Sequence, residues 1–486
     1  MKQIISFNNK YVLKPDSGRT LILSSMVGRN LNPSMEDSFT NVIHPIYAMI
    51  LSFIDGRDLK ACVNDAAEYL AVSPELVSTF IKKLIDNPNR VVFRCKEGVS
   101  AFPPFTIIST QQEISIKYFP DMFSYESIDL SMKRHLTPST ITLMVNNTCF
   151  TDCIYCYQDK RKIHKCSIPL KRIIEIIHEA RLLHVNSFDV IGGEFFLYPN
   201  WKEVLAELRK YNFNPYISTK IPLKENDISF LAEIGLCDIQ LSIDSFLEEH
   251  LTTSLRVKSG YVDSLKETLN LLEKYGISVM VHTVLTKYND SIEDMKSIYD
   301  VISKKSNILH WHIVKGDSTL YPKVEYSQIE ISDEAINNMS RYMSDLSEKS
   351  KFQIIYPQPT IETENQNNFE DLKQTFFNRS FCSGLYSSLY ILPDGQVTMC
   401  EQLYWNPIFI VGNILENSIK EIWNSQKALS LYNIKQSDIP KESLCSSCKD
   451  FRSCREFKQV CYREIIKKYG PDKWFYPDAG CPYAKD

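Results

Sequence analysis

From Thr140 onward, short apolar runs alternate with amphipathic stretches. The apolar runs predict strands at Ile141–Val145, Phe188–Ile191, Tyr216–Ser218, Ile239–Ile243, Val279–Leu285 and Ile308–Val314. Between them, apolar residues recur every three or four positions, as in Leu170-Ile173-Ile174-Ile177-Ala180 and Leu265-Leu269-Leu272, which predicts helices packed on a sheet. Gly235 and Gly276 fall where such helices would end. Alternating strands and helices predict an α/β fold with parallel strands.

Residues 1–105 follow a different pattern. Strand-like segments occur at Ile4–Phe7, Tyr11–Leu13, Thr20–Leu23 and Arg90–Phe93, and helical patterns at His44–Ile54, Leu59–Leu70 and Pro74–Ile85. Ser73 is the expected N-cap of the third helix, with Pro74 in its first turn. A small sheet with three helices predicts a winged-helix-like α+β domain.

The carboxy-terminal part begins with a helical stretch, Asp333–Lys349. Further on, Asp394-Gly395 before Val397–Met399 predicts a hairpin turn that places Cys400 at a strand end. We therefore expect an amino-terminal domain (1–105), a linker (106–138), an α/β core (139–330), a bridging region (331–378) and a cysteine-rich domain (379–486).

Composition narrows the class of protein. The 486 residues include 55 basic and 59 acidic side chains, a net charge of −4, which does not favour a nucleic-acid partner. The first residues do not resemble a signal peptide, and the longest apolar stretch, near Ile46–Ile54, is too short to cross a bilayer. We expect a cytoplasmic protein without a membrane partner, in which many of the 14 cysteines bind metal.

Cys149, Cys153 and Cys156 have the spacing C-x3-C-x2-C. Three thiolates suit a four-iron cluster with one iron left unligated, where a substrate or cofactor can chelate. A zinc knuckle is the alternative, although structural zinc sites usually have four closed ligands. The motif, with the aromatic Tyr155 before its third cysteine, resembles the signature of radical S-adenosylmethionine (SAM) enzymes.

The resemblance implies a partial (β/α)6 TIM-like barrel, a [4Fe-4S] cluster and SAM as cofactors. In this family, an electron from an external flavodoxin- or ferredoxin-type reductant reaches the cluster, and SAM is cleaved to a 5′-deoxyadenosyl radical that abstracts hydrogen from a C–H bond. Reacting groups sit at the carboxyl ends of the barrel strands.

Four strand ends carry the residues that the resemblance assigns to SAM. Gly192, Gly193 and Glu194 match the segment that binds the methionyl amino group, although Phe195 stands where the family usually has proline. Ser218 matches the position near the methionyl carboxylate, and Ser242 and Asp244 match positions near the ribose hydroxyls. Without the cysteine motif, Gly-Gly-Glu would indicate only a strand-end turn, and Ser218 and Asp244 have structural capping as an alternative role.

A second cysteine system resembles the SPASM extension, which in peptide-modifying radical SAM enzymes holds up to two auxiliary [4Fe-4S] clusters. The resemblance assigns an outer cluster to Cys445, Cys448, Cys454 and Cys481, and an inner cluster to Cys382, Cys400 and Cys461. Lys458 occupies the place where the family has its next cysteine, so Cys461 departs from the pattern. A zinc ribbon is the alternative for this region.

Two further assignments rest on position. Glu401 follows Cys400, where related sulfatase-maturing enzymes have a catalytic base, and a solvated surface role is its alternative. Of the remaining cysteines, we expect Cys62 and Cys237 to be small core residues.

The amino-terminal pattern resembles the domain with which peptide-maturation enzymes bind the leader of a precursor peptide by strand addition. The resemblance includes the segment His44-Pro45-Ile46-Tyr47-Ala48-Met49-Ile50-Leu51. A DNA-binding winged helix is less favoured, because the third helix carries only Lys82 and Lys83 as basic residues.

The combined hypothesis is a radical SAM oxidoreductase that modifies a ribosomally made peptide through a thioether, carbon–carbon or ether cross-link, or by epimerisation. Three alternatives remain open at this stage: a sulfatase-type formylglycine maturase, a zinc-binding winged-helix regulator, and a redox scaffold that only transfers electrons.

Overall fold

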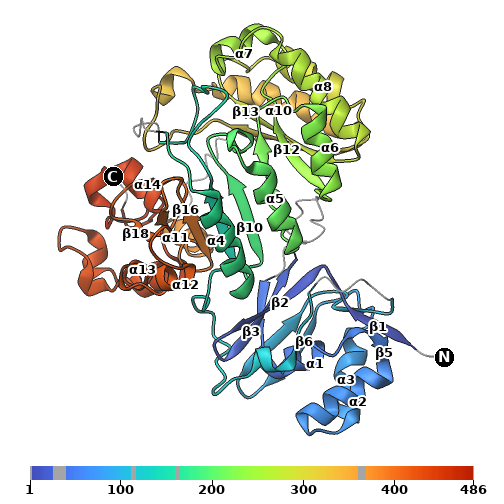
Figure 1. Ribbon diagram of the computed structural model, residues 1–486. Coiled ribbons are helices and arrows are strands. Elements are labelled where there is room, and N and C mark those ends of the chain that lie inside the picture. The colour runs from blue at the N-terminus through green and yellow to red at the C-terminus, as the bar shows by residue number, and fades with distance from the viewer. Residues whose placement is uncertain (1–2, 26–39, 111–115, 160–164, 359–367, 485–486) are drawn as a thin grey trace. The chain divides into compact units, whose positions relative to one another are not determined.

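The computed structural model describes residues 3–25, 40–110, 116–159, 165–358 and 368–484. The chain divides into two compact units. The first comprises residues 1–140, 180–188 and 210–215, and the second comprises residues 141–179, 189–209 and 216–486. Figure 1 labels their elements.

The first unit contains three small antiparallel sheets. The three-stranded sheet β2-β3-β4 consists of Tyr11–Asp16, Arg19–Ser24 and Thr40–Ile43. A second sheet, β5-β1-β8, consists of Asp55–Asp58, Ile4–Phe7 and Ile107–Ile108. The hairpin of β6 and β7 consists of Val91–Cys95 and Gly98–Phe102.

Three helices pack on these strands, namely α1 (Pro45–Leu51), α2 (Leu59–Leu70) and α3 (Pro74–Leu84). Their apolar faces enclose an aromatic core in which the Tyr47 ring stacks on Phe80 at 4.8 Å and Phe102 is fully buried. Aromatic pairs of this kind add to the free energy gained from burying their area.

The strands and helices predicted for residues 1–105 are all present, and Ser73 and Pro74 begin α3 as expected. Strands β4, β5, β7 and β8 were not predicted. Their sequences lack apolar alternation, as in the Asp-Gly-Arg-Asp of β5, so tertiary pairing decides their conformation. Residues 106–138 contribute Tyr118 and Phe123 to the core of this unit.

The six predicted strands are β9 (Thr140–Met144), β10 (Ser187–Ile191), β11 (Ser218–Thr219), β12 (Asp238–Ser242), β13 (Ser278–Leu285) and β14 (Ile308–Lys315), which lie in the second unit except for the first residues of β9 and β10. Strands β11 to β14 pair in parallel, and β15 (Gln353–Ile355) extends that sheet. In the described residues, β10 and β11 belong to different hydrogen-bonded sheets. At this interruption, the Tyr216 amide donates to the Asp189 carboxylate (2.9 Å) in place of a ladder bond.

Helices alternate with these strands: α4 (Leu170–Leu182), α5 (Trp201–Lys210), α6 (Glu225–Glu233), α7 (Glu248–Ser254), α8 (Tyr261–Lys274), α9 (Ile292–Ile302) and α10 (Asp333–Ser347). Gly235 and Gly276 have φ of 71° and 72° just after α6 and α8. Because glycine adopts this left-handed conformation without strain, the two predicted helix ends are confirmed.

The cysteine-rich part completes the second unit. Its antiparallel strands β16 (Ser388–Ile391), β17 (Gln396–Thr398) and β18 (Ile410–Asn413) form one sheet with β10 and β9, in the order β10-β9-β16-β17-β18. Gly395, at φ 88°, makes the predicted hairpin turn before β17. The helices here are α11 (Phe369–Phe377), α12 (Ile419–Trp423), α13 (Gln426–Tyr432) and α14 (Tyr462–Tyr469).

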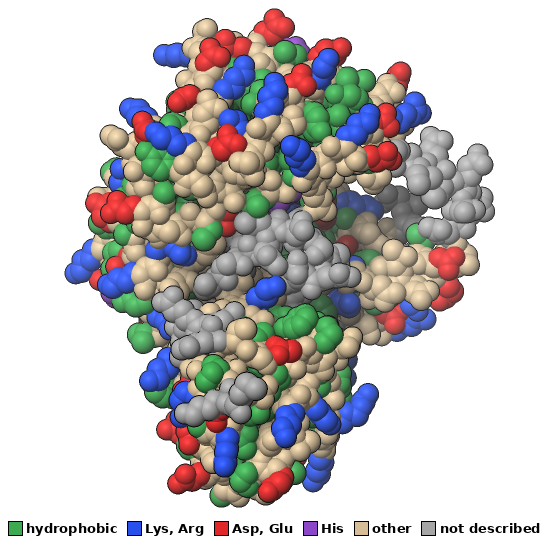
Figure 2. Space-filling view, turned by 90° about the vertical axis from the view of Figure 1, so that its right-hand side faces the viewer, with side chains coloured by type: hydrophobic (Ala, Val, Ile, Leu, Met, Phe, Trp, Pro, Cys, Tyr) green, Lys and Arg blue, Asp and Glu red, His purple; other side chains and the backbone are tan. Residues whose placement is uncertain are grey.

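Charged side chains of both signs are interspersed over the face in Figure 2, which agrees with the small net charge. Among the helices formed by described residues, none combines the length and apolar character needed to cross a membrane.

Candidate active site

A pocket of about 360 Å³ opens at the carboxyl ends of the parallel strands in the second unit. Its wall comes from the loop after β9 and from the ends of β10 to β14, and is completed by Gln402 and Arg463 of the cysteine-rich part. This is the edge at which the parallel pattern predicted a ligand site.

Cys149, Cys153 and Cys156 all line this pocket. The loop that carries them is fixed by backbone hydrogen bonds from the amides of Asp152 and Ile154 to the carbonyls of Leu255 and Ser254, both 3.0 Å. Burial raises the pKa of the Cys153 thiol, and Thr151 Oγ1 lies 3.2 Å from its sulfur. Three thiols from one loop therefore reach one cavity.

The Gly-Gly-Glu segment packs against the start of the cysteine loop. The amide of Gly193 donates to Asn146 O (2.8 Å), and the amide of Glu194 donates to Thr148 O (2.6 Å). A Cβ on Gly193 would lie 2.2 Å from that Thr148 oxygen, so a larger residue does not fit. We predicted that glycine would allow the backbone to approach a ligand, but at Gly193 the close neighbour is the cysteine loop itself.

Glu194 is 6% exposed and lines the pocket. Its carboxylate accepts hydrogen bonds from Thr219 Oγ1 (2.9 Å) and from the Lys220 amide (3.2 Å). Burial raises the pKa of Glu194, and these two bonds oppose the rise. The carboxylate is thus held in one orientation at the pocket wall, where it can accept a further hydrogen bond from an ammonium group.

The strand-end residues assigned to SAM do not all reach the wall. Ser218 and Ser242 line the pocket, and Ser242 Oγ accepts a hydrogen bond from Gln240 Nε2 (3.1 Å). Asp244 is 2% exposed and is not part of the wall. Its ribose-binding role stays a prediction.

The wall also contains residues that were not predicted from the sequence, including Gln158, Lys220, His282, Gln402 and Arg463. Lys220 follows Ser218-Thr219, so the rule that located Ser218 also indicates Lys220. His282 lies on β13 beside His312 of β14, and burial lowers its pKa to about 4, so its imidazole is neutral near pH 7. Arg463 carried no signal, because only folding brings α14 to the pocket.

The inner auxiliary cysteines lie near one another. Burial and then the neighbouring Cys461 raise the pKa of the Cys382 thiol. For Cys400 burial is the main cause of a pKa of about 12, with smaller contributions from Glu401, Cys382 and Cys461. Cys461 is exposed and forms the N-cap of α14.

The thiols of the outer set lie close enough to influence one another electrostatically. The pKa of the Cys481 thiol is raised by burial and by Cys445 and Cys448, and burial raises that of Cys454 to about 11, with Cys481 contributing. Cys454 lies in a π-helical turn, Arg452–Lys458, a conformation frequent at functional sites.

Arginine side chains approach these sulfurs. Arg379 donates to Cys454 Sγ (3.3 Å) and Arg455 to Cys445 Sγ (3.8 Å). Donors of this kind stabilise thiolates and iron–sulfur clusters. The described residues contain no three His, Cys, Asp or Glu side chains placed as ligands of a single metal ion.

Glu401 is partly buried and is not part of the pocket wall, which its neighbour Gln402 joins. Burial, with a smaller contribution from Asp189, raises the pKa of its carboxyl group.

Of the cysteines outside both systems, Cys62 is buried as predicted. Cys237 is exposed, so its prediction as a core residue was wrong, because it lies in the turn between α6 and β12 rather than within an element.

Comparisons with known proteins agree with this site. Residues 143–302 match the model of the radical SAM superfamily, and residues 382–449 match that of the SPASM iron–sulfur cluster-binding domain. The first range contains the cysteine loop and the ends of β10 to β13, and the second contains four of the seven auxiliary cysteines assigned above.

Two curated proteins of Bacillus subtilis are similar in sequence. The sporulation killing factor maturation protein SkfB is 25% identical over 60% of this chain and 67% of its own. The antilisterial bacteriocin subtilosin biosynthesis protein AlbA is 20% identical over 72% of each chain.

The fold is similar to that of Streptococcus suis SuiB. The crystal structure of SuiB bound to precursor peptide SuiA has a TM-score of 0.66 at 14% identity, and covers 98% of this chain and 99% of that one. SuiB bound to S-adenosylmethionine has a TM-score of 0.61 at 13% identity over the same shares. Residues 143–302 therefore form a radical SAM domain and residues 382–449 a SPASM iron–sulfur cluster-binding domain, and the cofactors are S-adenosylmethionine, a [4Fe-4S] cluster and auxiliary iron–sulfur clusters.

Proposed function

We propose that this enzyme modifies a ribosomally made precursor peptide at an unactivated C–H bond. The observation that carries the proposal is that Cys149, Cys153 and Cys156 line the same pocket as Glu194, whose carboxylate is held by hydrogen bonds. When bound together, the reduced cluster would give one electron to SAM and so supply a 5′-deoxyadenosyl radical, the group able to abstract hydrogen from the substrate.

The residues of the pocket bind and orient these groups. The three thiols would hold the cluster, and Glu194 would accept the methionyl ammonium group, with Gly192 and Gly193 beside it. Ser218 and Ser242 offer hydroxyl groups at neighbouring strand ends. Aromatic wall residues such as Phe150, Tyr155 and Tyr157 exclude water from the reacting atoms.

A peptide substrate is supported by the relatives and by the first unit. SkfB is named for maturation of the sporulation killing factor, AlbA for biosynthesis of the bacteriocin subtilosin, and SuiB is seen bound to the precursor peptide SuiA. The first unit of this chain offers small antiparallel sheets to which an extended leader can add a strand. The precursor peptide is therefore the proposed partner of this unit, and a one-electron reductant is the proposed partner of the cluster.

The strand edge that we propose for the leader is that of β6. Strand β4 has β7 beside it, because the His44 amide donates to Ser100 Oγ (2.9 Å) and Asn41 Nδ2 donates to Ala101 O (3.4 Å). Among the described strands, β6 pairs with β7 alone. A groove between α3 and β6 is lined by Lys82, Lys83 and Arg90, which favours an acidic leader segment.

The SPASM cysteines supply the proposed ligands of the auxiliary clusters. Cys445, Cys448, Cys454 and Cys481 would close an outer cluster, whereas Cys382, Cys400 and Cys461 would leave an inner cluster one ligand short. Loss of a hydrogen atom from the substrate leaves a radical, and forming a cross-link from it requires loss of one further electron, which an inner cluster held by these cysteines would accept. This favours cross-linking over epimerisation. Glu401, with its raised pKa, is the proposed base that takes the substrate proton.

The test uses the full-length reconstituted enzyme with SAM, a reductant and, as substrate, any short peptide that a neighbouring gene encodes. Mass spectrometry of the peptide distinguishes the outcomes, since a cross-link removes two hydrogens, whereas epimerisation in D₂O adds one deuterium. Cys153→Ala is the inactive control. An unmodified peptide, with SAM cleavage intact, would argue against this substrate class, and formylglycine in a sulfatase-derived peptide would indicate the sulfatase-maturing alternative.

The docking site has a separate test. Lys83→Glu combined with Arg90→Glu should weaken binding of the labelled leader peptide to the full-length enzyme at least tenfold. The control is Lys60→Glu, which reverses an exposed charge on α2 of the same unit. Equal leader affinity in all three proteins would place the leader elsewhere.

A further inference from the structure

Tyr155 connects the cysteine loop to the ends of two barrel strands. It lies between Cys153 and Cys156, and its hydroxyl group donates a hydrogen bond to Asp244 Oδ2, just beyond the end of β12. Its ring also lines the pocket. Asp244 is therefore hydrogen-bonded to the loop that carries the three proposed cluster ligands.

Lys220 holds the same carboxylate from the other strand end. Its Nζ lies 3.0 Å from Asp244 Oδ2 and 5.6 Å from the centroid of the Tyr155 ring, within the range of a cation–π contact. The side chain of Asp244 is 1% exposed and that of Lys220 is 15% exposed. A carboxylate buried to this degree needs such a partner, because removing one member leaves an uncompensated charge.

The second oxygen of Asp244 is occupied as well. Oδ1 accepts a hydrogen bond from the backbone amide of Val284 (3.0 Å) on β13. Val284 itself lines the pocket, whereas Asp244 does not. Both carboxylate oxygens are thus engaged with protein groups behind the wall.

The network continues to Glu194. The Lys220 amide donates to Glu194 Oε2 (3.2 Å), and the Lys220 carbonyl accepts a hydrogen bond from the Tyr261 hydroxyl group (2.7 Å). Lys220 therefore links Glu194 to the cysteine loop. Its backbone amide binds Glu194, and its side chain contacts Asp244 and Tyr155.

We propose that Asp244 and Lys220 are positioning residues, which hold the cysteine loop in register with Glu194 through the hydroxyl group of Tyr155, and that Asp244 does not bind the ribose of SAM. The proposal rests on the radical SAM assignment and does not depend on the peptide. It predicts that removing the hydroxyl group of Tyr155 disturbs the cluster and weakens SAM binding, even though Asp244 itself is still present.

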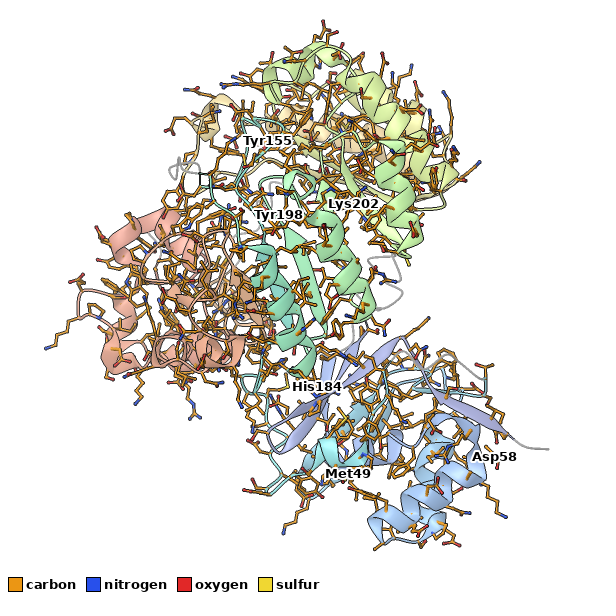
Figure 3. All side chains as sticks on the ribbon, in the orientation of Figure 1. Met49, Asp58, Tyr155, His184, Tyr198 and Lys202 are labelled. Carbon is orange, nitrogen blue, oxygen red and sulfur yellow. The ribbon has the colours of Figure 1, made fainter. Side chains whose placement is uncertain are left out.

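The test compares full-length Tyr155→Phe, Asp244→Asn and Lys220→Met with Tyr198→Phe; Tyr155 and Tyr198 are labelled in Figure 3. Tyr198 is 3% exposed and donates to Ile168 O (2.9 Å), so this control deletes a buried tyrosine hydrogen bond of the same unit outside the network. The readout is the change that SAM causes in the electron paramagnetic resonance spectrum of the reduced cluster, which gives both a spectral signature and a dissociation constant for SAM.

Tyr155→Phe, Asp244→Asn and Lys220→Met should each alter the spectrum without SAM and raise the SAM dissociation constant about tenfold. Lys220→Arg, which keeps the charge, should restore most of the affinity, and Tyr198→Phe should match the wild type. If Tyr155→Phe matches Tyr198→Phe while Asp244→Asn weakens SAM binding, Asp244 contacts the ligand and the proposal is wrong. Neither readout requires the peptide, so an unmodified peptide leaves this test intact.

Discussion

Replacing Gly193 by alanine should displace the cysteine loop. The added Cβ would lie 2.2 Å from Thr148 O and 2.5 Å from Thr148 C, which are backbone atoms that no side-chain rotation can move. Overpacking of this kind costs about 1–3 kcal/mol. The shift also strains the two backbone hydrogen bonds that join this segment to the loop, at about 1 kcal/mol each, so the total loss is about 3–5 kcal/mol.

Two other glycines provide a graded comparison. A Cβ on Gly192 would lie 3.3 Å from Asn146 O, a tight contact that a small shift relieves. A Cβ on Gly480 would find no atom closer than 3.7 Å, so Gly480→Ala should be nearly neutral. The expected order of destabilisation is Gly193→Ala, then Gly192→Ala, then Gly480→Ala.

Thermal unfolding of the cluster-free protein measures this order. For a domain of 150–250 residues, 3–5 kcal/mol corresponds to a fall in melting temperature of roughly 6–20 °C. Iron bound after anaerobic reconstitution should fall by about one cluster in Gly193→Ala and stay unchanged in Gly480→Ala. If Gly193→Ala melts and loads iron like Gly480→Ala, the close packing of Gly193 on Thr148 does not hold the loop.

The remaining predictions concern the clusters and the response to acid. Cys153→Ala should abolish formation of 5′-deoxyadenosine, measured by liquid chromatography, because the loop loses one of its three thiols; residual cleavage would exclude that thiol as an essential ligand. Cys448→Ala should retain some cleavage but give no modified peptide by mass spectrometry, and unimpaired peptide turnover would contradict the proposed role of the SPASM clusters. His135 is 4% exposed, and burial, with smaller contributions from Arg19 and Lys14, lowers its pKa from 6.5 to about 3. Between these values the unfolded chain binds a proton that the folded state excludes, so the free energy of unfolding decreases as the pH is lowered, by roughly 2–3 kcal/mol from pH 7 to pH 4.5. His135→Asn should reduce this slope in urea unfolding measured from pH 7 to 4.5, and an unchanged slope would show that other groups cause it.

The regular α/β part of the fold could be predicted because its strands are short, apolar and separated by amphipathic helices. The six strand positions depend on local pattern, which the sequence carries directly. The interruption between β10 and β11 could not be predicted, because it depends on the side chain of Asp189 taking the place of a backbone acceptor. Strand β9 pairs with β16, which lies about 250 residues further along the chain, and no local sequence pattern encodes such pairing.

The site shows the same division. Their positions after predicted strands indicated that the three cysteines and Glu194 share one edge of the sheet, because the carboxyl ends of parallel strands converge. Asp244 lies behind the wall because Tyr155 and Lys220 donate hydrogen bonds to its carboxylate, and both donors come from other parts of the chain. Spacing predicts which residues share an edge, and packing decides which of them face the ligand.

The pairing of β9 with β16 has a practical consequence for work with this enzyme. Cutting the chain before residue 379 would expose one edge of β9, a buried strand next to the cysteine loop, and a bare edge of this kind favours aggregation. A barrel expressed without its tail is therefore a poor substitute for the whole enzyme. Chimaeras that exchange SPASM domains between relatives need a donor whose first strand matches β9 in register. We therefore expect that the SPASM domain and the strand β9 evolve together rather than as exchangeable modules.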